Sequence, residues 1–357
     1  MSRWFLVIPL VMVALTATGA PTNGSLVDDR EISINTEADL TRLRLRLIRF
    51  IWGQDQLPDR MPDSVSTAES PMPNVDNLER VESILITMEA GQRTIAYHYV
   101  PRKRNSRLVI VHQGHVCETG AGGVGNVIRD LVRGGYSVRA MNMPRCWAGD
   151  CPADCTAVHN QMFASIHLSQ GSPLKFFLEP IALSLNHLQR HGIDGVHYTD
   201  FNMLGLSGGG WTTTVYAAID PRITLSFPVA GTLPLYLRHD GSVGDLEQTL
   251  PEFYRIAGYL DLYVLGSSGA SRKQVQILNE RDDCCFGAAQ HKIPANYKED
   301  VRGYERLVQQ KLTRLGAGTF KLEIDSIAPS HMISGYASTS LILHELNQTK
   351  HNNGGKQ

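Results

Sequence analysis

The sequence predicts an α/β protein with a mostly parallel central sheet and helices on both faces. Beyond residue 80, short apolar runs alternate with stretches of helix length, which is typical of repeated strand–helix units. The series opens with two apolar-rich segments, 80–88 and 93–100, separated by the turn-like Glu89-Ala-Gly-Gln92, as in an antiparallel hairpin. No internal repeat or change of composition divides the rest, so we expect one domain over 79–357.

Six further apolar runs have the length of buried strands, and helix-length stretches lie between or after them. The expected strands cover 108–111, 136–143, 201–206, 223–229, 275–278 and 320–324. The expected helices cover 124–133, 173–191, 208–219, 296–315 and 331–347. Parallel strands that helices cover on both faces are apolar along their whole length, so these runs indicate a parallel arrangement.

The first 20 residues have the pattern of a secretory signal peptide, with one cation, an apolar run over 4–15 and small residues after it. A membrane anchor is the alternative, but about a dozen apolar residues interrupted by Pro9 fall short of the roughly 20 that span a bilayer. No later segment is long and apolar enough for an integral membrane helix. The glycosylation motifs Asn23-Gly-Ser and Asn347-Gln-Thr fit a secretory route. We expect signal peptide 1–20 and a secreted protein, extracellular or periplasmic, that begins near Pro21.

Residues 21–78 are expected to form an N-terminal helix and an extended connection. Thr36 and Asp39 make a capping-box-like start for a helix over 36–52, although the alternating Leu and Arg residues within it also fit a strand. A basic amphipathic helix could bind a membrane surface, but we favour packing on the domain with the arginine heads turned outward. Four prolines within 53–78 indicate the connection.

Composition and charge exclude several function classes. Lys and Arg number 34 against 35 Asp and Glu, a net charge of −1, and the short basic clusters form no stripe that could follow a phosphate backbone. We therefore expect no nucleic-acid partner. A content of 42% hydrophobic and 19% charged residues is typical of a folded globular chain and excludes disorder. No motif indicates a cofactor, and none indicates an oligomeric state.

Six cysteines suit an oxidising compartment. Their even number indicates disulfides without fixing the pairing. Cys151 and Cys155 have ligand-like spacing, as do His112 and His115, but no zinc signature surrounds either pair, so we expect bridges and no metal. The cysteines are Cys117, Cys146, Cys151, Cys155, Cys284 and Cys285.

The motif Gly205-Leu-Ser207-Gly-Gly209 has the form of a nucleophile elbow. It follows the expected strand 201–206 and opens the expected helix 208–219, which is the setting that such an elbow requires. The glycines let the backbone take a strained turn that lifts the Ser207 hydroxyl above the sheet. A glycine-rich turn without catalytic function is the alternative, and the strand–turn–helix context favours a nucleophile.

A serine hydroxyl needs a base to remove its proton, and the base needs an anion to orient it and to stabilise its charged form. His331 suits the base best, because it follows the last expected strand after a short loop and begins the last expected helix. Asp282 is the first candidate for the acid and Asp283 the second, since both follow the expected strand 275–278. Weaker candidates are Glu280, Asp240, Asp245 and Asp261.

The tetrahedral intermediate of acyl transfer also needs backbone donors for its oxyanion. The amide of Gly208, the residue after the nucleophile, is expected to be one. The loop after the expected strand 108–111 reads His112-Gln-Gly-His115, with a glycine where backbone must come close to substrate. We expect the amide of His115 to be the second donor, and the imidazoles of both histidines to bond to neighbouring backbone.

Together these residues resemble the α/β-hydrolase superfamily over about residues 80–349. The resemblance depends on the elbow around Ser207, the later acid in Arg281-Asp-Asp283, the final His331 and the loop at 112–114, and it looks closest to extracellular or periplasmic esterases and to peptidase-like members. It implies the α/β-hydrolase fold and a serine hydrolase acting on a small-molecule or polymeric carboxylic ester. One departure is that the loop is not the His-Gly-Gly-Gly form of the hormone-sensitive-lipase group. The alternatives are a serine peptidase and a non-catalytic binding protein on the same scaffold.

The cysteines follow expected strands at the carboxyl edge of the sheet, where folds of this kind build their sites. Disulfides are therefore expected to brace the loops around the site. A ring closed between adjacent cysteines is strained, so Cys284 and Cys285 are expected to bond to two separate partners.

Overall fold

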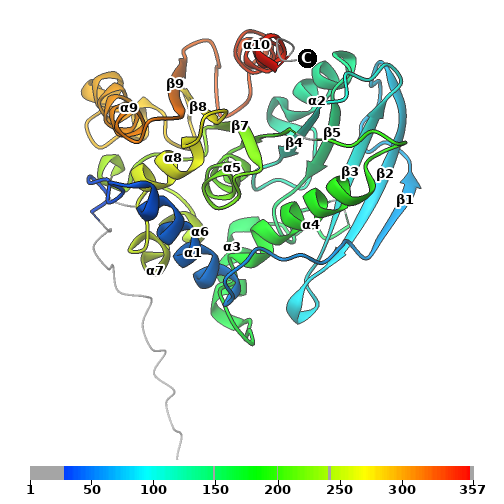
Figure 1. Cartoon of the computed structure of the whole chain (residues 1–357), viewed down its shortest axis with the longest axis horizontal. Coiled ribbons are helices and arrows are strands. Elements are labelled where there is room, and N and C mark those ends of the chain that lie inside the picture. The colour runs from blue at the N-terminus through cyan, green and yellow to red at the C-terminus, as the bar shows by residue number, and fades with distance from the viewer. Residues whose placement is uncertain (1–27, 148, 199, 240–242, 354–357) are drawn as a thin grey trace, which may run out of the picture.

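A nine-stranded sheet forms the centre of the protein (Figure 1). The computed structural model describes residues 28–147, 149–198, 200–239 and 243–353, so the expected signal peptide and the first glycosylation motif lie outside the described residues. The strands lie in the order β1-β2-β3-β5-β4-β6-β7-β8-β9. Pairing is antiparallel from β1 to β5 and parallel from β5 to β9. The predicted mostly parallel sheet is confirmed.

Every expected strand is present, and no strand end differs from the expected one by more than two residues. β1 lies within the stretch expected to be a connection, and its mostly exposed, polar residues give no apolar pattern that would mark a strand. The strands are β1 (Ser64–Ala68), β2 (Leu78–Thr87), β3 (Arg93–Pro101), β4 (Leu108–His112), β5 (Ser137–Met141), β6 (Phe201–Leu206), β7 (Ile223–Val229), β8 (Lys273–Asn279) and β9 (Thr319–Asp325).

The expected helices are also present, with one correction at the last of them. Its helical turns begin after His331 rather than at it, because the hydroxyl of Ser334 accepts a hydrogen bond from the amide of Ala337 (3.0 Å) and so caps the helix there. The structure adds α3, α6, α7 and α8; α8 is buried along its whole length and has no polar face to give a helical pattern. The helices are α1 (Glu37–Trp52), α2 (Val124–Arg133), α3 (Cys155–Ser165), α4 (Lys175–His191), α5 (Gly208–Ile219), α6 (Leu246–Thr249), α7 (Pro251–Tyr254), α8 (Tyr259–Ser267), α9 (Tyr297–Arg314), the π-helical Ala337–Leu343 and α10 (His344–Asn353).

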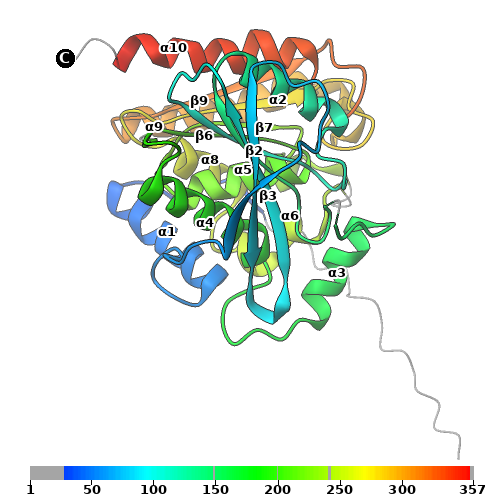
Figure 2. The ribbon, with the colours of Figure 1, turned by 90° about the vertical axis from the view of Figure 1, so that its right-hand side faces the viewer.

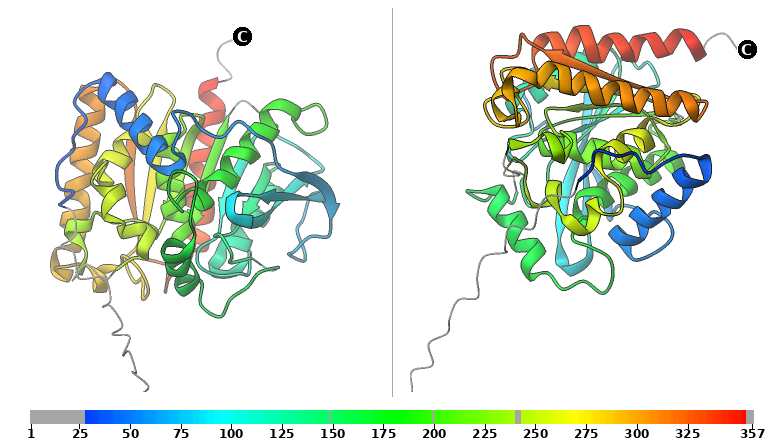
Figure 3. Two further views of the ribbon diagram at one scale, coloured as in Figure 1. Left: turned by 90° about the horizontal axis from the view of Figure 1, so that it is seen from below. Right: turned by 90° about the vertical axis from the view of Figure 1, so that its left-hand side faces the viewer.

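Helices cover both faces of the sheet, as predicted. One apolar core joins the sheet to α1, α4, α5, α8 and α9, and a second core joins it to α2 and the helical end of the chain. Figures 2 and 3 show α1 (blue) and α10 (red) on opposite sides of the molecule. Between these layers the parallel strands end at one common edge, from which the loops with the expected site residues leave.

The N-terminal helix α1 packs on the domain. Thr36 Oγ1 accepts from the amide of Asp39 (3.2 Å) and the amide of Thr36 donates to Asp39 Oδ2 (2.9 Å), which is the predicted capping box. Arg44 departs from the expected outward orientation: its guanidinium donates to the carbonyl oxygens of Ala218 (3.1 Å) and Leu265 (2.9 Å), in the last turns of α5 and α8. Within the described residues, no helix is long and apolar enough to cross a membrane.

Candidate active site

Ser207 occupies the turn between β6 and α5. Its backbone has φ 60° and ψ −126°, a conformation that costs on the order of 1–3 kcal/mol for a residue with a side chain. Two glycines make the turn possible: a Cβ atom at Gly205 would lie 2.2 Å from the carbonyl oxygen of Gly209, and one at Gly209 would lie 2.2 Å from that of His112. The turn has the geometry of a nucleophile elbow at the carboxyl edge of the sheet.

Asp282 and His331 are joined by a short hydrogen bond in the loops that follow β8 and β9. Nδ1 of His331 lies 2.7 Å from Oδ2 of Asp282, whose side chain is fully buried. The other oxygen, Oδ1, accepts the amides of Cys284 (2.9 Å) and Cys285 (2.7 Å). These bonds hold Asp282 as an acceptor, so the proton of a neutral His331 ring lies on Nδ1 and the lone pair on Nε2.

Asp283 makes a different contact with the same residue. Its Oδ1 accepts the backbone amide of His331 at 3.1 Å, so Asp282 holds the ring and Asp283 holds the main chain. Asp240 lies outside the described residues. The remaining weaker candidates have other partners: Glu280 pairs with Lys298, Asp261 accepts from Ser33, and Asp245 faces His115.

The imidazole of His331 has the properties of a general base. Burial lowers its pKa, but the hydrogen bond and the charge of Asp282 outweigh this, with smaller contributions from Cys284 and Asp283, so the pKa lies above 6.5. Nε2 is buried and has no hydrogen-bond partner among the described residues, and so it is not bonded to the Ser207 hydroxyl. Catalytic hydrogen bonds are often formed only when substrate is bound, and Nε2 is the atom that would take the serine proton.

The loop after β4 lies against the elbow. A Cβ atom at Gly114 would be 2.6 Å from Cβ of Ser207, so only glycine fits at this position. The amides of Gln113, Gly114 and Val116 each have an acceptor, whereas in the described part of the chain the amide of His115 has none. That free amide is consistent with the second oxyanion donor expected from the sequence, which stays a prediction.

The other expected donor, the amide of Gly208, is the first of α5 and has no acceptor within the helix. The ring of His115 packs against Gly208, because a Cβ atom at Gly208 would be 2.5 Å from Cε1 of His115. The two expected donors therefore come from segments that touch, and any side chain at Gly208 would displace the ring of His115.

The two loop histidines differ in their partners. Nδ1 of His112 lies 2.8 Å from the carbonyl oxygen of Gln113, as expected for a bond to neighbouring backbone. The same expectation is wrong for His115, whose Nε2 lies 2.9 Å from Oε1 of Glu247 and 3.1 Å from Nδ1 of His159. Burial lowers the pKa of His115, but the hydrogen bond to Glu247 and the charges of Glu247 and Asp245 raise it above 6.5.

Neither His159 nor Glu247 was among the expected site residues. They are 44 and 132 residues from His115 along the chain, and no spacing links the three. His159 lies on α3 and Glu247 on the single turn α6, which are two helices that the sequence pattern does not indicate. Only the tertiary fold brings this group to the loop after β4.

Two disulfides hold the loop after β4 and the segment after β5: Cys117–Cys151 and Cys146–Cys155. The expectation of bridges that brace these loops is confirmed. The expectation for Cys284 and Cys285 is wrong, because the other four cysteines pair among themselves, and these two Sγ atoms lie 2.8 Å apart beside Asp282. A hydrogen bond from Cys285 lowers the pKa of the Cys284 thiol to about 7.

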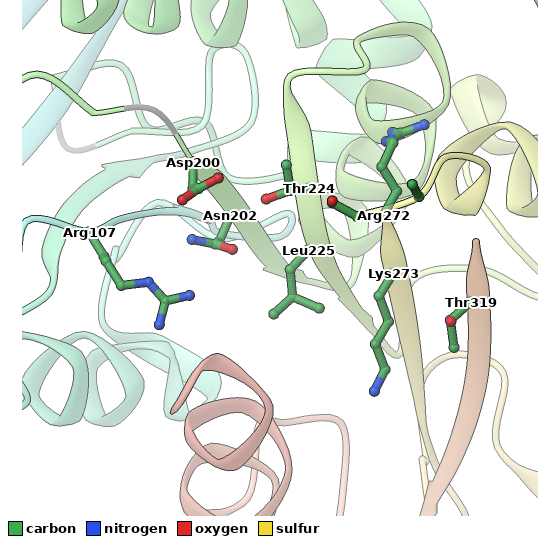
Figure 4. A pocket seen from close by; sticks show the side chains of 10 residues that line it. Arg107, Asp200, Asn202, Thr224, Leu225, Arg272, Lys273 and Thr319 are labelled. Carbon is green, nitrogen blue, oxygen red and sulfur yellow. The ribbon is translucent and has the colours of Figure 1, made fainter. Parts of the chain in front are cut away.

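A polar pocket lies at the opposite edge of the sheet, at the amino ends of β6 to β9 (Figure 4). Arg272 in its wall donates to the carbonyl oxygens of Ile223 (3.0 Å) and Leu265 (2.7 Å), and Lys273 pairs with Glu345 (2.7 Å). Both cations therefore have partners within the fold: Arg272 bonds to β7 and α8, and Lys273 bonds to α10. The residues that line the pocket include none of the candidate catalytic residues.

The sheet order and the elbow define the α/β-hydrolase fold, and the solved structure of a methylesterase agrees. The methylesterase BT1017 superposes with a TM-score of 0.57 at 15% identity, over 85% of this chain and 61% of the methylesterase, so this chain spans less than two thirds of that protein. The Pyrococcus furiosus esterase PF2001 has a TM-score of 0.49 at 14% identity, over 83% of this chain and 96% of the esterase. Acetyl xylan esterase 1 from Thermoanaerobacterium sp. JW/SL YS485 has a TM-score of 0.46 at 14% identity, over 85% and 92%. No known protein family and no curated protein matches the sequence. At 15% identity, the likeness to the methylesterase supports the fold alone.

Proposed function

We propose that this protein is a serine hydrolase that cleaves carboxylic esters through an acyl-enzyme on Ser207. The arrangement at one sheet edge supports this most: a serine in a strained elbow after β6, and Asp282 bound to Nδ1 of His331 in the loops after β8 and β9. Nucleophile, acid and base follow along the chain in the order that α/β hydrolases use. The esterase activity named for the structural neighbours agrees with an ester substrate.

In the proposed reaction, Oγ of Ser207 attacks the ester carbonyl carbon while Nε2 of His331 takes its proton. Asp282 holds the ring and stabilises the imidazolium, and the amides of Gly208 and His115 stabilise the oxyanion. Collapse of the intermediate transfers the proton to the leaving alcohol and leaves the acyl group on Ser207. Water, deprotonated by His331, then attacks the acyl-enzyme and releases the acid.

A fluorophosphonate probe tests the nucleophile, and a panel of p-nitrophenyl esters and peptide amides tests the substrate class. We expect one adduct per chain, located on Ser207 by peptide mass spectrometry, and turnover of esters in preference to amides. Preferential cleavage of amides would favour a serine peptidase. Absence of both labelling and turnover would favour a non-catalytic binding protein.

We also propose that the protein is secreted, which the N-terminal pattern and the two disulfides support. N-terminal sequencing of the exported protein is expected to begin near Pro21. Peptide mapping without reduction is expected to recover Cys117–Cys151 and Cys146–Cys155. An intact Met1 together with six free thiols would contradict the proposal.

The ester turnover is expected to rise with pH through a midpoint above 6.5. His331 must be neutral to accept the proton of Ser207, and Asp282 raises the pKa of His331 from 6.5 despite its burial. The protonated, inactive form therefore persists to higher pH than for a free imidazole. The pH dependence of kcat/KM over roughly pH 5–9 checks this.

The variant Asp283→Asn serves as a control for the pH dependence, because it removes one of the charges that raise the pKa of His331. Asp283 contributes a smaller rise to the pKa of His331 than Asp282 does, so its loss is expected to move the midpoint slightly down. A midpoint below 6.5 in the unaltered protein would show that His331 is not the base that limits activity.

A further inference from the structure

We infer that His115, His159 and Glu247 form a binding site for a divalent transition-metal ion of the zinc type, beside the proposed oxyanion loop. The residues come from three segments: the loop after β4, α3 and α6. Helices α3 and α6 contact each other, and Figures 1 and 2 show them as neighbours. The potential ligand atoms of the three side chains all lie within 4.8 Å of one another.

The donor atoms have the spacing of ligands around one ion. Nε2 of His115 lies 2.9 Å from Oε1 of Glu247 and 3.1 Å from Nδ1 of His159, and the latter two atoms are 3.7 Å apart. A tetrahedral zinc ion with bonds of about 2.0–2.1 Å has ligand atoms roughly 3.3 Å apart. The observed distances lie on both sides of this value, as expected for one face of such a tetrahedron.

Each imidazole has a second polar partner at its other ring nitrogen, where ligating histidines in metal sites also have one. Nε2 of His159 lies 2.9 Å from the carbonyl oxygen of Pro144, so it carries the proton and Nδ1 turns its lone pair to the group. Nδ1 of His115 lies 3.3 Å from Oδ2 of Asp245. A proton on that nitrogen leaves the lone pair of Nε2 for an ion.

Hydrogen bonds within the group do not satisfy its polar atoms. A single proton on Nε2 of His115 would face two acceptors, Nδ1 of His159 and Oε1 of Glu247. The side chain of Glu247 has no exposed surface, and its Oε2 has no hydrogen-bond partner among the described residues. A buried carboxylate that is incompletely paired is costly, and a divalent cation would supply the missing charge and contact.

Three protein ligands leave a fourth position for water or another ligand, as in open zinc sites. The ion would hold the ring of His115 against the elbow, because that ring lies where a Cβ atom of Gly208 would be. The consequence for catalysis rests on the proposed function: a fixed His115 also fixes its amide, the expected oxyanion donor. The ion would then act on the reaction by positioning the loop.

Metal binding by the full chain tests the inference without reference to activity. Protein dialysed against EDTA is titrated with Zn²⁺ in competition with a chromogenic chelator, and with Co²⁺ while visible absorption is recorded. We expect one tightly bound Zn²⁺ per chain and the intense Co²⁺ bands of a four-coordinate site. Glu247→Gln and His159→Gln are each expected to weaken Zn²⁺ binding by about 100-fold or more.

Two control variants separate this site from other ligands. Cys284, Cys285 and His331 form a second group with ligand-like distances, so the double variant Cys284→Ser/Cys285→Ser is titrated as well. His187→Gln removes another partly buried histidine, on α4. Both controls are expected to bind Zn²⁺ as the unaltered chain does, and thermal unfolding shows whether each variant is folded.

Three results would overturn the inference. They are no tight Zn²⁺ binding by the unaltered chain, unchanged affinity in both Glu247→Gln and His159→Gln, and loss of binding in the cysteine variant alone. In an active enzyme, removal of the ion is expected to lower kcat by about tenfold or more with little change in KM. Because stoichiometry and affinity are measured directly, the metal site stands or fails independently of the ester hydrolysis.

Discussion

Replacing Ser207 with alanine is expected to lower kcat on the best ester by about five to six orders of magnitude and to abolish labelling by the fluorophosphonate. The hydroxyl is the atom that forms the acyl-enzyme, and no neighbouring side chain can replace it in the elbow. In the described part of the chain its Oγ makes no hydrogen bond, so the variant is expected to keep its melting temperature within a few degrees. Turnover, labelling and thermal unfolding of the same preparation check the three expectations.

His331→Ala is the partner experiment. Nucleophile and base act as a unit, so the single variants are expected to lose similar activity, and the double variant no more than either. His187→Gln serves as the control for histidine replacement, since this residue lies on α4, outside the proposed site. Near-normal ester turnover by Ser207→Ala would show that the elbow assignment is wrong.

The part of the site that depends on local sequence could be predicted. The strand 201–206, the turn at Ser207 and the helix 208–219 were expected with the bounds that the structure shows, because apolar run, glycines and helix follow one another within 19 residues. The position of Asp282 followed from the strand before it. In both cases the end of a buried strand fixes the place of the next residues.

What depends on distant segments could not be predicted. The group of His115, His159 and Glu247 forms only when α3 and α6 meet the loop after β4. The cysteine pairing likewise depends on how the segment after β5 folds back, which left Cys284 and Cys285 without the separate partners expected for them. Sequence spacing carries no information about contacts of this kind.

Asp282→Asn is expected to lower kcat by about four orders of magnitude, or about 5.5 kcal/mol of barrier. Oδ2 accepts from Nδ1 of His331 at 2.7 Å, and an asparagine that turns its NH₂ to this atom would favour the wrong tautomer and could not stabilise the imidazolium. The Oδ1 position can still accept the amides of Cys284 and Cys285, so the fold is expected to be retained. Turnover on one ester, with thermal unfolding alongside, measures the loss.

Asp283→Asn is the matched comparison, because it removes the same charge one residue away. Among the described residues its carboxylate accepts one hydrogen bond, from the backbone amide of His331 at 3.1 Å, and an asparagine oxygen can accept the same bond. The ring of His331 would then keep its tautomer and its anion, so the loss of kcat is expected to stay below about tenfold. If Asp283→Asn lost the greater activity of the two, the acid would be Asp283, and the bond between Asp282 and the ring would serve the structure of the loop instead of the reaction.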